Sequence, residues 1–183
     1  MLICEDSEKV ASILEKLFEK RFDLLFALSV DEGLALLRER GRETDPGRRF
    51  AVAIVDLSFG EGRGMPNTEG FRVLEEVQKD PFMEPIVFTG TGEDVQKAIQ
   101  SLERGAFRYV LKGPDKNRLS DGSIANLKRA VTEALACWKA LVELDAMLDQ
   151  LANAQVRDIL KHARLIFECI QQIRGRGKQR QRR

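Results

Sequence analysis

The sequence is poor in the residues that build zinc sites and disulfide frameworks. It has three cysteines, Cys4, Cys137 and Cys169, and one histidine, and no two cysteines form a Cys-x-x-Cys pair. A structural zinc site takes four Cys or His ligands, and a disulfide framework takes cysteines in pairs. The composition argues against both, and we expect reduced thiols in a cytoplasmic protein.

Long apolar segments are also missing. No segment approaches the roughly 20 apolar residues of a membrane-spanning helix, and the N-terminus lacks the basic and apolar regions of a signal peptide. Hydrophobic residues nevertheless make up 43% of the 183 residues, enough to bury a core. We expect a soluble protein without membrane contact, built as one domain plus an extension.

Basic residues are concentrated at the C-terminus, although the formal net charge is only +1. The last ten residues contain six basic and no acidic residues, which leaves 24 basic and 29 acidic residues elsewhere, a formal charge of −5. A nucleic-acid interface would need stacking aromatic side chains or a recognition-helix motif, and the tail has neither. We therefore expect residues 175–183 to be a solvated, disordered tail.

A short apolar segment that ends on a carboxylate organises the rest of the chain. Residues 51–56 read Ala-Val-Ala-Ile-Val-Asp, which predicts a buried central strand of a parallel sheet, with Asp56 at the open end where α/β folds place ligands. Residues 1–4 form a second such segment, and Glu5 and Asp6 directly follow it. Parallel strands end at the same edge, so three carboxylates should meet there. A hard divalent cation would neutralise their repulsion.

Strand and helix patterns alternate along the first part of the chain with short connections. Strands are expected at 1–4, 22–28, 51–56, 84–88 and 107–111, and helices at 7–20, 29–39, 69–79 and 91–104. The alternation predicts an α/β protein with a doubly wound (βα)5 parallel sheet of the flavodoxin-like type, in the strand order 2-1-3-4-5.

Residues beyond 120 depart from this alternation. No proline or glycine occurs between Ile124 and Ile173, and apolar residues recur at spacings of four and three. The first seam is Leu127, Val131, Ala134, Trp138, Leu141, Asp145 and Leu148, in which Asp145 is the one polar position, and the second is Val156, Ile159, Ala163, Ile166, Ile170 and Ile173. The phase shift near Asn153 suits either a helical hairpin, which we favour, or one continuous coiled-coil helix. Because such a seam needs a partner, we expect a homodimer through these helices.

Two later strands end on residues that complete a known pattern. The fourth expected strand is followed by Thr89 and the fifth by Lys112. An acidic pair, an Asp, a hydroxyl and a Lys, each after a different strand and in this order, closely resemble the receiver domain of two-component response regulators, from Met1 to about Pro114. We therefore expect a receiver domain at 1–118, a helical extension at 119–174 and the basic tail at 175–183.

The resemblance implies that Asp56 accepts a phosphoryl group from a sensor histidine kinase or a phosphotransfer protein. Glu5 and Asp6 then match the acidic pair that holds Mg²⁺ together with Asp56, and the backbone carbonyl of Ser58 supplies a further ligand. A carboxylate is a competent nucleophile toward phosphorus when a cation screens the approaching negative charges.

Three further residues match the family's switch. Thr89 matches the hydroxyl that bonds a phosphoryl oxygen, and Lys112 matches the ammonium that pairs with the same group. Tyr109 matches the aromatic side chain that turns inward when Thr89 moves. These roles describe a signalling module whose phosphorylation alters a dimerisation or partner-docking surface, and not an enzyme that turns over a substrate.

The chain departs from the family pattern at two places. The family's Pro and Gly lie four and eight residues after the acceptor, whereas Pro66 and Gly70 lie ten and fourteen residues after Asp56, so six extra residues overhang the site. After the Lys the family usually has a Pro with a cis peptide, but here Gly113 follows Lys112. A cis bond before a residue other than proline is costly, so we expect this peptide to be trans.

Three other functions compete with a phosphorylated switch. A regulated nucleic-acid binder would use the basic tail, and a receiver that is never phosphorylated would act as an interaction module. A Mg²⁺-dependent phosphohydrolase of the haloacid-dehalogenase type needs a second Asp two residues after its nucleophile, where Ser58 stands. The sequence therefore argues against the hydrolase.

Overall fold

The computed structural model describes residues 1–40, 49–58, 69–90, 95–113 and 119–152. Its centre is a sheet of five parallel strands in the order β2-β1-β3-β4-β5. The strands are β1 (Leu2–Cys4), β2 (Leu25–Ala27), β3 (Val52–Val55), β4 (Glu84–Thr89) and β5 (Arg108–Leu111). The predicted fold class and strand order are confirmed.

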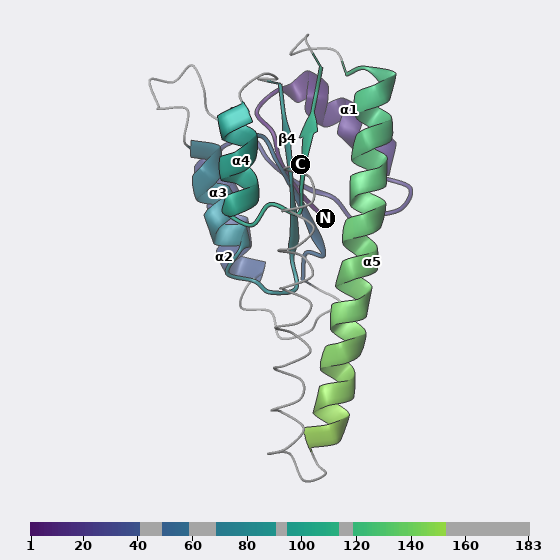
Figure 1. The fold of residues 1–183 in the computed structure, drawn as a ribbon. Coiled ribbons are helices and arrows are strands. Elements are labelled where there is room, and N and C mark those ends of the chain that lie inside the picture. The colour runs from purple at the N-terminus through teal and green to yellow at the C-terminus, as the bar shows by residue number, and fades with distance from the viewer. Residues whose placement is uncertain (41–48, 59–68, 91–94, 114–118, 153–183) are drawn as a thin grey trace, which may run out of the picture. The chain divides into compact units, whose positions relative to one another are not determined.

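Helices cover both faces of this sheet. They are α1 (Glu8–Phe18), α2 (Val30–Arg40), α3 (Glu69–Val77), α4 (Val95–Glu103) and α5 (Asp121–Ala152). The first half of α5 and α1 lie on one face, and α2, α3 and α4 lie on the other (Figure 1). Successive strand residues point to opposite faces, so Ile3 and Ile54 join the core with α1 and α5, whereas Cys4 and Val55 join the core with α2 and α3.

Polar side chains start α1 and α2. The Ser7 hydroxyl accepts a hydrogen bond from the Val10 N–H at 3.5 Å, and the Ser29 hydroxyl accepts one from the Glu32 N–H at 3.3 Å. The Glu32 carboxylate in turn accepts a hydrogen bond from the N–H of residue 28 at 2.8 Å. These bonds satisfy N–H groups that have no partner within a helix, and so they determine where the helices begin.

The first turns of α5 belong to the core of the sheet domain. Leu127, Val131 and Ala134 are buried in the apolar core that contains the central strands. The expectation that the whole seam faces a partner outside the sheet is therefore wrong for these three positions, because the sheet itself buries them. The compact unit that contains the sheet extends to Lys139, and the following unit is described only at 140–152.

The predicted long C-terminal helix is present, since α5 is 32 residues long. The predicted hairpin or coiled-coil segment beyond Asn153 and the tail at 175–183 lie outside the described residues, and the proposed boundaries at 118 and 174 stay predictions. Among the residues that the structure describes, no helix has both the length and the apolar character needed to cross a membrane.

Candidate functional site

Three charged residues meet at the edge where the strands end. Glu5 follows β1, Asp56 follows β3 and Lys112 follows β5. Backbone hydrogen bonds extend the sheet to these positions: the Asp56 N–H donates to the carbonyl of Cys4 at 3.0 Å, and the Lys112 N–H donates to the carbonyl of Thr89 at 2.9 Å. The sheet therefore positions the backbone of each candidate site residue.

The Lys112 ammonium lies between two carboxylates. Its Nζ donates to Oε2 of Glu5 and to Oδ2 of Asp56, both at 2.5 Å, and it lies 5.7 Å from the centre of the Phe88 ring. Each of the three charged side chains is at most 5% exposed. Buried charges are stable only when they are paired and hydrogen-bonded, so the three groups act as one electrostatic unit.

Burial and charge pairing oppose each other in this unit. Burial raises the pKa of Glu5 from its ordinary value of 4.5 to about 7. The positive charge of Lys112 lowers this pKa and the negative charge of Asp56 raises it, and the raising effects outweigh the lowering one. Burial by itself would lower the pKa of Lys112, but the negative charges of Asp56 and Glu5 raise that pKa above its ordinary value. Lys112 is therefore charged at neutral pH, where Glu5 is partly protonated.

Without divalent cations, the free energy of unfolding is expected to fall as the pH rises from about 5 to about 8. The unfolded chain releases the Glu5 proton near pH 4.5, whereas the folded protein holds it up to a pH of about 7, which is the folded pKa. The stabilisation from the Glu5 proton is therefore complete below pH 4.5 and is lost as the pH rises through the folded pKa. Between these values the free energy of unfolding falls with a slope on the order of 1 kcal/mol per pH unit. Urea unfolding at successive pH values measures this slope. Glu5→Gln should lack it, and equal slopes in both proteins would contradict the shift.

Glu5, Asp6 and Asp56 form an acidic cluster at the same edge. One carboxylate oxygen of each lies within 4.8 Å of the others, and Asp6 is exposed, so a cation can approach from solvent. Oxygen ligands of this kind suit Mg²⁺, which binds through one or two carboxylates and keeps several waters. The donor set therefore fits the ion that the sequence predicted.

Ser58 links Asp56 to Thr89. The Ser58 N–H donates to Oδ1 of Asp56 at 2.9 Å, and the Ser58 hydroxyl oxygen lies 3.3 Å from that of Thr89, where either hydroxyl can be the donor. Thr89 is fully buried at the end of β4, and Ser58 is half-buried. The two oxygens of Asp56 thus have different partners, the Ser58 N–H for Oδ1 and the Lys112 ammonium for Oδ2.

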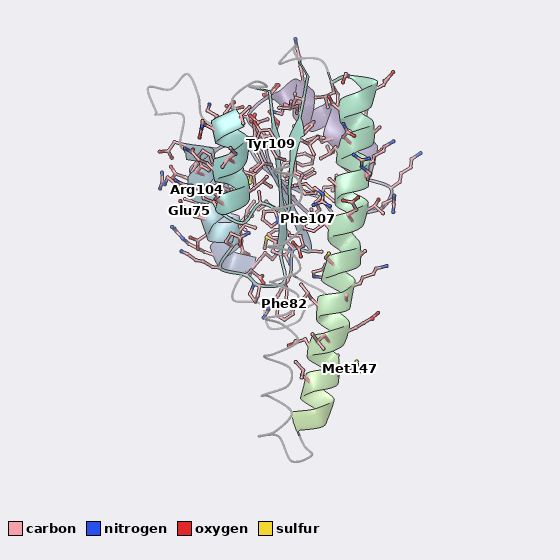
Figure 2. The ribbon with its side chains drawn as sticks, viewed as in Figure 1. Glu75, Phe82, Arg104, Phe107, Tyr109 and Met147 are labelled. Carbon is pink, nitrogen blue, oxygen red and sulfur yellow. The ribbon has the colours of Figure 1, made fainter. Side chains whose placement is uncertain are left out.

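Tyr109 lies on β5 beside an apolar cluster that includes residues of α3 (Figure 2). It is half-buried. The cluster consists of Leu57, Phe71, Leu74, Val87 and Ala106. The register partner of Tyr109 on β4 is Val87, two residues before Thr89. The structure therefore places the predicted switch aromatic on the strand next to the predicted switch hydroxyl.

Two glycines accommodate the departures from the family pattern. A Cβ at Gly70 would lie 2.5 Å from the carbonyl oxygen of Asp56 and 2.6 Å from the Cα of Leu57, so only glycine allows α3 to start this close to the end of β3. The six extra residues lie outside the described residues.

The second departure, after Lys112, is accommodated by Gly113. Its φ is +109°, which favours glycine. No cis peptide occurs in the described part of the chain, so the Lys112–Gly113 peptide is trans as predicted.

Comparison with known proteins agrees with this geometry. The family model of the response regulator receiver domain matches residues 1–122. The chain therefore belongs to the receiver-domain family of two-component signalling. No curated protein matches the sequence.

Solved structures share the fold. A response regulator receiver domain protein from Clostridium thermocellum is 27% identical, and the match covers 76% of this chain and 96% of that chain with a TM-score of 0.58. A CheY-like receiver domain protein from Methanospirillum hungatei JF-1 is 23% identical, with coverages of 76% and 94% and a TM-score of 0.56. An adenylate cyclase from Rhodopirellula baltica is 21% identical, with coverages of 81% and 95% and a TM-score of 0.60. The last two likenesses show the fold alone.

Sequence reasoning placed the site residues at one edge but missed two contacts. It assigned Glu5 to a cation and Lys112 to a phosphoryl group without pairing them, and it used only the backbone of Ser58. The pairing had a signal, because two acidic residues and one Lys follow strands of a single sheet. No sequence pattern distinguishes a Ser58 hydroxyl that contacts Thr89 from one that faces solvent.

Proposed function

We propose that this receiver domain is switched by phosphorylation of Asp56. The observation that carries the proposal is the buried Asp56 carboxylate, which has one oxygen on the Lys112 ammonium and the other on the Ser58 N–H. An Asp56 oxygen forms a bond to phosphorus while the P–N bond of a phosphohistidine breaks. The electron pair of that bond returns to the imidazole, which takes up a proton. The donor is a sensor histidine kinase or a phosphotransfer protein.

Lys112 and Thr89 then stabilise the added group. The Lys112 ammonium already contacts Asp56 and can pair with a phosphoryl oxygen, and the Thr89 hydroxyl is connected to the same carboxylate through Ser58. Tyr109 follows the movement of Thr89 and carries the change to the surface of the sheet edge. The domain works as a switch and not as a turnover enzyme.

Mg²⁺ is the cofactor in this proposal. Glu5, Asp6 and Asp56 would hold it together with the backbone carbonyl of Ser58. When bound, the ion supplies positive charge that screens the approach of a phosphoryl group to the carboxylates. Asp6 is the exposed member of the cluster, so it is the carboxylate that a hydrated cation meets first.

Asp6→Asn is expected to lower the affinity for Mg²⁺ at least about tenfold, which corresponds to about 1.4 kcal/mol. The amide keeps an oxygen donor but removes one negative charge from the cluster. Isothermal titration with MgCl2 measures the affinity. The control is Asp31→Asn at the exposed start of α2, which should bind Mg²⁺ like the wild type. Equal affinity in the Asp6→Asn protein would show that the cluster is not the metal site.

Incubation with phosphoramidate and Mg²⁺, followed by mass spectrometry of the peptides, tests the proposed function. The expected result is one phosphoryl group on the peptide that contains Asp56. Its absence would favour a receiver that acts as an unphosphorylated interaction module. Steady release of phosphate from phosphomonoesters would favour a hydrolase instead.

We further propose that α5 beyond the receiver core mediates homodimerisation. Trp138, Leu141 and Leu148 continue the seam after the buried positions, and each keeps part of its surface exposed. A helix gains most of its stability by burying such an apolar face. A second copy of the chain offers the same face, and phosphorylation at the sheet edge would change the geometry of the pair.

The double variant Leu141→Glu with Leu148→Glu is expected to be monomeric at a concentration of about tens of micromolar, and the wild type is expected to be a dimer at the same concentration. Moderate interfaces are occupied at this concentration. Charges placed in a buried seam lose their hydration, which opposes association. Light scattering on the full chain measures the mass. Ala146→Glu, at an exposed position of the same helix, should remain dimeric. A wild type that is monomeric with and without a phosphoryl mimic would exclude dimerisation.

A further inference from the structure

We infer that the Ser58 hydroxyl is a brake on the switch, which holds Thr89 in the position that it occupies before phosphorylation. The inference rests on the proposed phosphorylation of Asp56. It starts from the 3.3 Å contact between the Ser58 and Thr89 hydroxyl oxygens. Ser58 is a positioning residue in this account, because its hydroxyl acts through Thr89 and not on phosphorus.

The unmodified carboxylate holds Ser58 in place for this contact. The Ser58 N–H donates to Oδ1 of Asp56 at 2.9 Å, and hydrogen bonds to a charged acceptor are stronger than those between neutral groups. The backbone of Ser58 is therefore fixed beside Thr89 as long as Asp56 keeps its charge. Thr89 is fully buried, so its hydroxyl can turn only by exchanging one hydrogen-bond partner for another.

Phosphorylation acts on both ends of this link. The charged carboxylate becomes the uncharged carbonyl end of an acyl phosphate, whose negative charge lies on the phosphoryl oxygens, so the bond from the Ser58 N–H to Asp56 weakens. The same oxygens are strong acceptors and offer a new partner to the Thr89 hydroxyl. Thr89 must leave Ser58 to bind them, and the free energy of that contact therefore opposes switching.

Removal of the hydroxyl should make switching easier. In the presence of Mg²⁺, Ser58→Ala should bind beryllofluoride, a tetrahedral mimic of a phosphoryl group on a carboxylate, about fivefold more tightly than the wild type, as expected for the loss of one neutral hydrogen bond. Ser58→Thr keeps a hydroxyl and should bind like the wild type. The affinity is measured by NMR titration of the methyl signal at position 89. An unchanged or weaker affinity in Ser58→Ala overturns the brake.

A double-mutant cycle tests whether Ser58 acts through Thr89. In the Thr89→Val background the partner hydroxyl is absent, so Ser58→Ala should leave the beryllofluoride affinity unchanged. An equal gain in both backgrounds overturns the inference, because Ser58 would then act independently of Thr89.

A measurement on the free protein tests the same contact without any phosphoryl mimic. Three-bond NMR couplings should show one Thr89 χ1 rotamer in the wild type and in Ser58→Thr, and a changed rotamer distribution in Ser58→Ala. The same single rotamer in all three proteins overturns the brake.

Failure of the proposed function has a different signature. The wild type would then bind no beryllofluoride even at saturating Mg²⁺, and the brake would be overturned together with the phosphoacceptor. Binding to the wild type without a gain in Ser58→Ala overturns the brake alone.

Discussion

Asp56→Asn is expected to abolish phosphorylation by phosphoramidate and Mg²⁺ while the fold survives. The amide has almost the same shape as the carboxylate, but it is a poor nucleophile toward phosphorus. Its oxygen can still accept the Ser58 N–H, and Lys112 keeps its bond to Glu5. Removal of one negative charge leaves a neutral pair of Lys112 and Glu5, so the free energy of unfolding should change by no more than about 1 kcal/mol.

Intact-mass spectrometry measures the label, and urea unfolding measures the stability. The matched control is Asp31→Asn, an exposed carboxylate on α2, which should be labelled like the wild type. Retention of phosphate on the peptide around position 56 in the Asp56→Asn protein would show that another residue is the acceptor. A variant that fails to unfold cooperatively would show that Asp56 is required for folding.

Lys112→Met is expected to lower the free energy of unfolding by about 3–5 kcal/mol at a pH of about 8, the range measured when one partner of a buried ion pair is removed. The substitution leaves the carboxylates of Glu5 and Asp56 buried without the ammonium that lies 2.5 Å from each. The loss should be smaller at a pH of about 5, because Glu5 can then bind a proton and relieve the repulsion. Mg²⁺ should stabilise this variant more than the wild type, because its charge replaces that of the ammonium.

Two control variants separate this buried unit from ordinary surface ion pairs. Arg108, on β5 itself, pairs with Glu133 at 2.9 Å, but the two side chains are 52% and 40% exposed, so Arg108→Met should cost no more than about 1 kcal/mol. Glu5→Gln combined with Lys112→Met should be more stable than Lys112→Met, because it removes one of the two repelling charges. Equal losses in Lys112→Met and Arg108→Met would contradict the electrostatic account of the site.

The fold and the location of the site were predictable from sequence because both depend on local patterns. Apolar segments such as 51–56, each followed by a polar residue, predict buried parallel strands and the edge at which they end. The order of these segments, separated by helical patterns, predicts the doubly wound sheet. The positions of Glu5, Asp56 and Lys112 at one edge follow from the same reasoning.

The start of α3 shows where the sequence was ambiguous and the structure was not. Counting residues put Gly70 six positions too far from Asp56 for the family pattern. In the structure a Cβ at Gly70 would overlap the carbonyl oxygen of Asp56. Gly70 therefore lies directly against the end of β3, although its spacing from Asp56 along the sequence differs from that of the family. The number of residues between Asp56 and Gly70 therefore does not report the distance between them.

By itself, the sequence determined the class of fold, the strand order, the long C-terminal helix and the set of residues at the edge where the strands end, since periodicity and strand-terminal residues are local properties. Only the tertiary structure decided which of these residues touch. The bonds from Lys112 to Glu5 and Asp56 join positions 107 and 56 residues apart, and Ser58 meets Thr89 across 31 residues. The burial of the first turns of α5 in the receiver core is also visible only in the tertiary structure. Such contacts depend on the rotamers that packing permits, and the local pattern of the chain does not encode these rotamers.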